Sequence, residues 1–193
     1  MSDNLKKETF TALFWSFLER FGTQLIQFGI SIILARLLLP KDFGLIAILY
    51  VFINLSNTLI NSGFGQALVQ KKAATFIDEC SIFYFNFFIA LLTVFCLFLF
   101  APSIAEFFDE PKLTKMTRVL SLALIFNSLG LVQRTLLAKN IDFKTQLKVS
   151  LLSIIISALL SISMALNGFG VWSLIGLYLC KDLFNTVFVW FFS

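Results

Sequence analysis

Polar side chains recur on one face of the apolar stretch from Thr11 to Leu39, and their types suit the binding of oxygen-rich groups. Helical steps of three and four residues place on this face Ser16, Arg20, Thr23, Gln24, Gln27 and Ser31. A guanidinium forms charge-assisted hydrogen bonds with anions, and Gln amides bind hydroxyls or water. Glu19 points roughly 100° away from Arg20 on a helix and is a poor partner for it.

Two structural explanations of this stripe compete with cavity lining. Gln and Ser side chains also join neighbouring membrane helices by hydrogen bonds, and an Arg near the membrane interface extends its charge into water. An unpaired guanidinium needs water or an anion, so Arg20 favours the lining of a water-filled cavity.

A second polar stripe follows on the stretch from Phe43 to Val69. Its members are Asn54, Asn57, Thr58, Asn61 and Gly65. Amides are wasteful against lipid, so we expect them to face the preceding helix or a cavity shared with it. The pattern does not separate these alternatives.

Charged residues also occur near the middle of the last apolar stretch. Lys181 and Asp182 share a broad polar face with Tyr178 and Asn185. A charge near the bilayer centre costs ~2.5–3.5 kcal/mol on insertion scales. The pair is therefore either a structural ion pair made through a neighbouring helix or an anion or proton site that couples ions to function.

The remaining polar residues favour structural roles. The serines at 150, 153, 157 and 161 form a small-residue stripe that predicts close helix packing. Arg118, near the outer end of its helix, and Asn127 and Arg134 on another face are interpreted as interface groups, and the stretch from Ile82 to Phe100 is expected to face lipid.

Enzyme chemistry finds little support in the sequence. There are no His residues, and Cys80, Cys96 and Cys180 are far apart. No nucleophile–base pair, metal-ligand cluster or glycine-rich phosphate loop is present. We therefore expect no catalytic residue, no metal, no cofactor and no nucleic-acid partner.

The composition indicates which kind of structural element carries these polar stripes. Of 193 residues, 59% are hydrophobic, 13% are charged and 25 are Phe, with a mean hydropathy of +0.91. Soluble chains average about 25% charged residues. The apolar runs do not alternate with a period of two, so the sequence predicts an all-α membrane protein and not a barrel. About six transmembrane helices are expected, at residues 11–39, 43–69, 81–101, 113–138, 147–166 and 169–192.

Local signals define the breaks between these helices. Pro40 is expected to stop the first, with Asp42 capping the second. Thr75 and Asp78 have capping spacing before the third, and Pro102 is expected to follow it. Further signals are Pro111 in the first turn of the fourth helix, Asp142 as cap of the fifth, and a turn at residues 167–170.

Loop charges predict a cytoplasmic N-terminus. In this orientation seven Lys residues lie on inner segments and three on outer loops, and the acidic loop from Glu106 to Glu110 is outside. No basic residue follows the sixth segment before Ser193. We interpret residues 1–193 as one transmembrane bundle that is a fragment truncated at its C-terminus.

The sequence resembles the bacterial polysaccharide transporter family. These are O-antigen and exopolysaccharide flippases of the MOP superfamily, kin of MATE exporters and lipid II flippases. The resemblance covers nearly the whole chain and rests on residues 14–22 (FWSFLERFG), 33–40 (ILARLLLP), 42–44 (DFG), 62–72 (SGFGQALVQKK), 132–134 (VQR), 142–144 (DFK) and 168–172 (GFGVW).

The resemblance implies a two-bundle transporter of which this chain is the N-terminal half. It implies a multi-pass protein of the bacterial inner membrane that flips undecaprenyl-diphosphate-linked oligosaccharide by alternating access. Implied partners are membrane lipid, the lipid-linked oligosaccharide, and a glycan polymerase with other assembly proteins. Arg20 would hold the diphosphate. Alternatives are a multidrug or small-molecule exporter, and a non-transporting scaffold or inactive fragment.

Overall fold

The computed structural model describes the backbone of residues 2–61 and 75–192, and this part of the chain is all helical. The elements are α1 (Ser2–Leu37), α2 (Pro40–Ile60), α4 (Phe76–Phe107), α5 (Lys112–Lys139), α6 (Phe143–Leu166) and α7 (Val171–Phe192). The motif at residues 62–72 and the end of the expected second helix lie outside the described residues.

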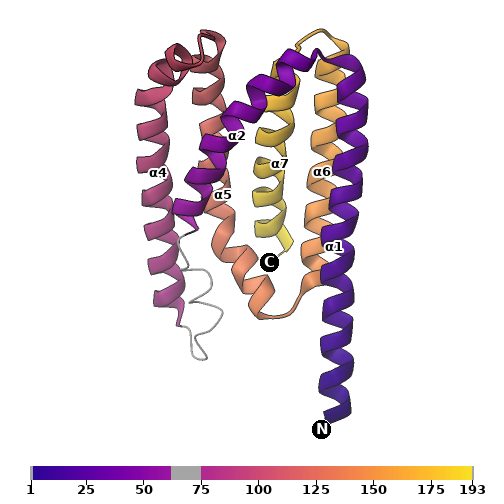
Figure 1. Ribbon diagram of the computed structural model, residues 1–193. Coiled ribbons are helices and arrows are strands. Elements are labelled where there is room, and N and C mark those ends of the chain that lie inside the picture. Colours follow the sequence, from indigo (N-terminus) through magenta and orange to yellow (C-terminus); the bar gives the residue numbers. More distant parts are fainter. Residues whose placement is uncertain (1, 62–74, 193) are drawn as a thin grey trace.

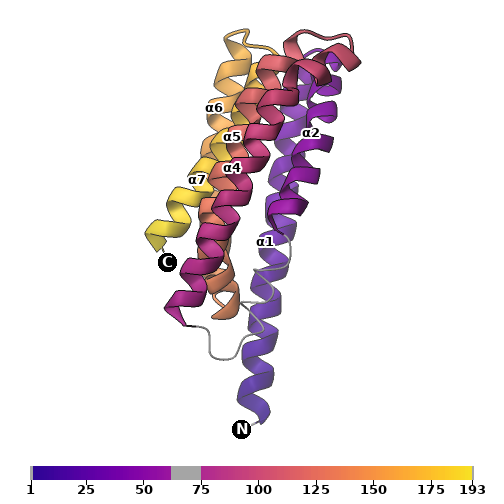
Figure 2. The same ribbon diagram turned by 90° about the vertical axis from the view of Figure 1, so that its left-hand side faces the viewer.

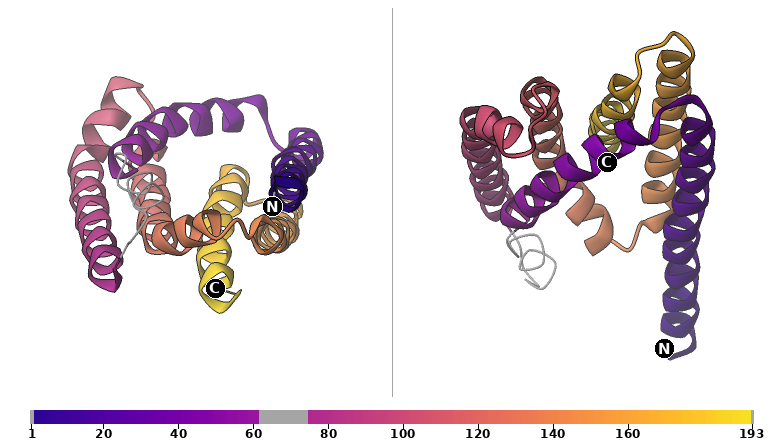
Figure 3. Two further views of the ribbon diagram at one scale, coloured as in Figure 1. Left: turned by 90° about the horizontal axis from the view of Figure 1, so that it is seen from below. Right: turned by 45° about the horizontal axis from the view of Figure 1, so that its top comes forward.

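The helices form a bundle crossed by one oblique member. Helix α1 lies beside α6, and its N-terminal part projects beyond the other helices (Figures 1 and 3). Helix α2 runs obliquely from the end of α1 across the bundle, where it contacts α4, α5 and α7. Figure 2 shows α7 ending toward the same end of the bundle as the N-terminus.

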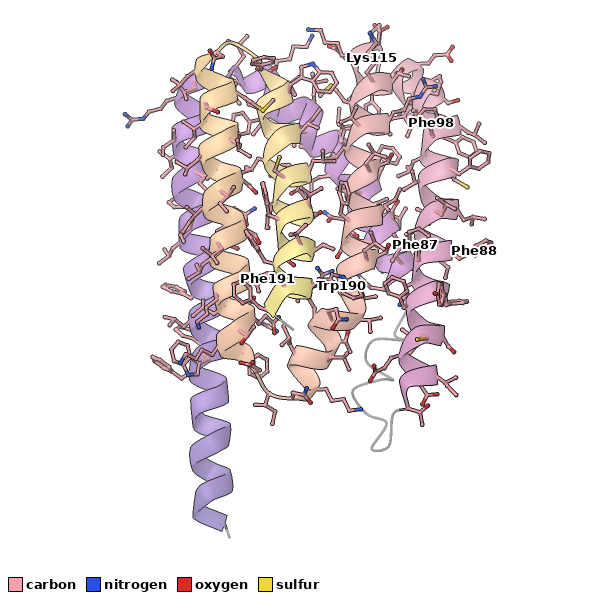
Figure 4. All side chains as sticks on the ribbon, turned by 180° about the vertical axis from the view of Figure 1, so that it is seen from behind. Phe87, Phe88, Phe98, Lys115, Trp190 and Phe191 are labelled. Atoms are coloured by element: carbon pink, nitrogen blue, oxygen red, sulfur yellow. The ribbon has the colours of Figure 1, made fainter. Side chains whose placement is uncertain are left out.

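Five of the helices in the described ranges, α2 and α4 to α7, are long and apolar enough to cross a membrane. Helix α1 does not meet this criterion, because Glu19, Arg20, Gln24 and Gln27 lower its hydropathy. It nevertheless packs along α6. Large apolar side chains cover the outside of the bundle, as with Phe88 on α4 (Figure 4). The chain is thus a multi-pass membrane protein.

Several helix boundaries follow the predicted signals. Thr75 caps α4 by accepting a hydrogen bond from the Asp78 backbone N–H, and Asp142 caps α6 by accepting one from the Thr145 N–H at 3.1 Å. The turn between α6 and α7 contains Gly168 and Gly170 at φ values of 80° and 55°. These left-handed conformations strain any residue with a Cβ.

The predictions from two prolines had different outcomes. The first helix stops at Leu37, just before Pro40, as predicted, and Pro40 is the first residue of α2. Its fixed φ suits that position, and Asp42 accepts a hydrogen bond from the Leu39 N–H within the first turn. Pro102 lies inside α4, since the helix continues to Phe107 and buries Ile104 and Ala105.

The serines of α6 pack as predicted. Ser153, Ser157 and Ser161 have no exposed surface, and the Ser161 hydroxyl donates to the Ser173 carbonyl of α7 at 2.8 Å. Small side chains allow this close approach of α6 and α7. The prediction that α4 faces lipid was incomplete, because its Asn86 side chain is fully buried.

Candidate functional site

A polar cavity lies within the apolar bundle, between α2, α5 and α7. Its volume is about 160 Å³, and its lining consists of Tyr50, Ile53, Asn54, Asn57, Leu120, Ala123, Asn127, Tyr178, Lys181 and Asp182. This volume admits several water molecules. It is below the roughly 300–1,000 Å³ typical of pockets for organic ligands, so the cavity is too small to hold a whole oligosaccharide.

Helix α2 supplies one wall through two residues of the predicted stripe, Asn54 and Asn57, together with Tyr50. Tyr50, Asn54 and Asn57 recur at steps of four and three residues, which places them on one face. Tyr50 packs edge-on against Tyr178 of α7, with ring centroids 4.6 Å apart. The oblique course of α2 across the bundle therefore turns part of its amide stripe toward α5 and α7.

A hydrogen-bond network joins the cavity wall to α5 and α7. Asn127 Nδ2 donates to Asn57 Oδ1 at 2.8 Å. Arg134 Nη2 donates to the backbone carbonyl oxygen of Asn127 at 2.7 Å and also to the side-chain Oδ1 of Asn127. Arg134 Nη1 donates to Asn185 Oδ1 at 2.9 Å. The network thus links α2, α5 and α7.

The interpretation of Asn127 and Arg134 as interface groups was wrong. Their side chains fold into the bundle because Gly130 leaves room for the guanidinium, and an added Cβ at Gly130 would lie 2.6 Å from Arg134 Nη1. The spacing Asn127, Gly130, Arg134 carried this information, since steps of three and four place all three on one face of α5.

Lys181 and Asp182 both line the cavity. The structural alternative for them was an ion pair, and no contact within 4 Å joins their charged groups or pairs either with another described residue. The ion pair that the described residues do contain joins Lys41 to Glu110, at the other end of α2. Two charged groups are therefore held near a small polar space without direct neutralisation.

Of the six residues expected to line a substrate cavity, the structure places two in the lining of this cavity and four elsewhere. Asn54 and Asn57 line the cavity between α2, α5 and α7, whereas Arg20, Gln24, Gln27 and Asn61 are not among its lining residues. Arg20, Gln24 and Asn61 are exposed and Gln27 is half-buried. Helix α1 packs on α6, and Gly65 lies outside the described residues.

The chain is similar in sequence to known polysaccharide biosynthesis proteins. The profile of the family described as "Polysaccharide biosynthesis protein" matches residues 33–193. The succinoglycan biosynthesis transport protein ExoT of Rhizobium meliloti is 31% identical over 161 residues, which cover 83% of this chain and 33% of that protein.

More distant relatives have related names. The lipopolysaccharide biosynthesis protein WzxC of Escherichia coli is 25% identical over 72% of this chain and 28% of its own length. The teichuronic acid biosynthesis protein TuaB of Bacillus subtilis is 26% identical over 51% of this chain and 20% of its own length. No solved structure matches.

The chain thus spans about a third or less of the length of these curated relatives. The family profile nevertheless covers most of the chain and all of the helices that line the cavity. This chain belongs to the polysaccharide biosynthesis protein family of membrane proteins.

Proposed function

We propose that this chain is part of an exporter that flips undecaprenyl-diphosphate-linked oligosaccharide across the inner membrane by alternating access. The observation that carries the proposal is the polar cavity between α2, α5 and α7, which holds amides and charges inside a lipid-exposed bundle. Intramembrane charges of this kind mark substrate or ion pathways. The names of the relatives, among them a succinoglycan biosynthesis transport protein, support polysaccharide precursors as the cargo.

In this proposal the diphosphate is held by Arg20. Its guanidinium is exposed on α1, and the neighbouring Glu19 is engaged by Ser150 of α6. Arg20 is therefore left to form charge-assisted bonds with phosphate oxygens. Gln24, Gln27 and Asn61 bind sugar hydroxyls or water beside it.

The small cavity has a separate role in the proposal. Asn54 and Asn57 bind one hydroxyl group or its water, and Lys181 and Asp182 couple ion or proton movement to the conformational change. The volume of about 160 Å³ supports this division, because it excludes the bulk of an oligosaccharide. The sugar chain then passes along the outside of this bundle, toward the glycan polymerase and other assembly proteins.

The test is complementation in a strain that lacks the gene. The full-length protein should restore surface glycan, and Arg20→Ala should abolish this restoration at equal membrane abundance. Arg36→Ala is the matched control, because Arg36 is also exposed on α1, and it should complement normally. Normal surface glycan in the deletion strain would disprove the export function. Normal complementation by Arg20→Ala would disprove the role of Arg20 alone.

A further inference from the structure

The hydrogen bonds that run from Arg134 to Asn57 have a fixed direction, because their first member can only donate. A guanidinium carries five N–H donors and no acceptor. Arg134 Nη2 reaches both the backbone oxygen and Oδ1 of Asn127, while Nη1 is engaged by Asn185. The Asn127 amide must therefore turn its oxygen toward Arg134. Because the guanidinium can only donate, it determines which amide atom of Asn127 is the oxygen and which is the nitrogen.

The same direction is passed on to Asn57. With its oxygen facing Arg134, Asn127 presents Nδ2 to α2 and donates to Asn57 Oδ1 at 2.8 Å. Asn57 must then turn its oxygen toward α5. Its own NH₂ group is left at the free end of the series, and Asn57 lines the cavity.

Close packing around the Arg134 guanidinium makes this arrangement definite. The Arg134 guanidinium fills the space above Gly130, where an added Cβ would lie 2.6 Å from Nη1 and 2.8 Å from Thr186 Oγ1. Thr186 is itself fixed, because its hydroxyl donates to the Phe126 carbonyl at 2.6 Å. A guanidinium enclosed in this way keeps its donors aimed at Asn127 and Asn185.

We propose that Arg134 is a positioning residue that acts through Asn127 to fix Asn57 as a hydrogen-bond donor to the cavity. The ligand group received at Asn57 then offers an accepting oxygen, such as a hydroxyl or phosphate oxygen. Lys181 presents further donors, and Asp182 supplies the accepting side of the cavity. The transport test of this inference rests on the proposed function, whereas its direct test does not.

The variant Asn127→Asp distinguishes two roles for Asn127. One role is to orient the Asn57 amide, and the other is only to compensate the charge of Arg134. The introduced carboxylate keeps an oxygen for Arg134 and adds an ion pair, but it cannot donate to Asn57. The Asn57 amide then turns its NH₂ toward this carboxylate and its oxygen toward the cavity. We expect a melting temperature no lower than that of the wild type, and a roughly tenfold fall in transport, as for one lost hydrogen bond.

Asn57→Asp is the second variant. It leaves the bonds between Arg134 and Asn127 in place, keeps an acceptor for Asn127 and removes the donor to the cavity, so transport should fall by a similar factor. Arg118→Gln is the control on the same helix as Asn127, because the Arg118 guanidinium lies over the Phe98 ring at 4.3 Å and Arg118 is not among the residues that line the cavity. It should transport normally. Wild-type transport by Asn127→Asp or by Asn57→Asp would overturn the inference.

Side-chain amide exchange gives a readout that does not depend on transport. The full-length protein is labelled with ¹⁵N-asparagine in lipid nanodiscs, and the Asn57 NH₂ signal is identified by its loss in Asn57→Asp. It should exchange with water faster than the Asn127 signal and slow in Asn127→Asp. An unchanged rate in that variant would contradict the inference. The expected exchange pattern in a protein that fails to restore glycan would disprove the proposed function and leave the inference standing.

Discussion

The Ser150 hydroxyl of α6 donates a hydrogen bond to the Glu19 carboxylate of α1, with 3.0 Å between Oγ and Oε1. This contact turns Glu19 toward α6. Arg20, one residue later, points roughly 100° away from it and remains exposed. The packing of α1 against α6 thus turns the two adjacent charged side chains in different directions.

Glu19→Ala should weaken the attachment of α1 to α6. A hydrogen bond to a charged group contributes about 1.5–3 kcal/mol, so we expect a loss of stability of that order in thermal or denaturant unfolding of the detergent-solubilised protein. Ser150→Ala should give a smaller loss, and the double variant should show coupling between the two sites. Gln24→Ala is the control on the exposed side of α1. Equal effects of Glu19→Ala and Gln24→Ala would contradict this prediction.

Gly130→Ala should displace the Arg134 guanidinium. The new Cβ would approach Nη1 to 2.6 Å and Thr186 Oγ1 to 2.8 Å, and overpacking of this kind costs about 1–3 kcal/mol. We expect a lower melting temperature and reduced transport. Gly22→Ala is the matched control on α1, since its Cβ would meet nothing within 4 Å; it should be neutral or stabilising, because Ala is the better helix former. Equal stability of the two variants would argue against the packing around Arg134.

The cap of α6 should make stability depend on acidic pH. Hydrogen bonds from the Thr145 hydroxyl and N–H lower the pKa of Asp142, which lies between the helices α5 and α6. A carboxylate whose folded-state pKa is depressed stabilises the fold above its unfolded value of about 3.9, and this contribution is lost as the pH falls through the folded pKa.

Asp142→Asn tests the Asp142 contribution directly. It keeps an N-capping side chain but removes the titrating group, so the fall of the melting temperature below about pH 4 should be shallower than in the wild type. Glu106→Gln is the control, because Glu106 is exposed and forms no cap. An acid dependence that is identical in wild type and Asp142→Asn would exclude this role.

The orientation predicted from loop charges can be tested at the two ends of α5. Lys115 lies in its first turn and Lys139 is its last residue. In a background without Cys80, Cys96 and Cys180, Lys115→Cys should react with a membrane-impermeant maleimide in intact spheroplasts. Lys139→Cys should react only after permeabilisation. The reverse pattern would place the N-terminus outside.

The sequence by itself determined the membrane class and most helix positions. Long apolar runs admit only helices in lipid, and local capping groups such as Thr75 and Asp142 act within their own turn. The close packing at the serine stripe of α6 was likewise predictable from the sequence, because small residues at helical spacing favour close packing whichever helix is the partner. Prolines were less consistent, since Pro40 marks the break between α1 and α2 whereas Pro102 is accommodated inside α4.

Only the tertiary structure decided which polar faces meet. Spacing gives the angle of a residue about its own helix axis, and it does not give the neighbour that this angle faces. The spacing left open whether the stripe of α2 faces α1 or a cavity shared with it, and the oblique course of α2 brings Asn57 to Asn127 of α5. The Arg134 guanidinium lies inside the bundle because Gly130 leaves space for it and α7 contacts it through Asn185. That arrangement combines groups more than 50 positions apart in the chain, so no local pattern contains it.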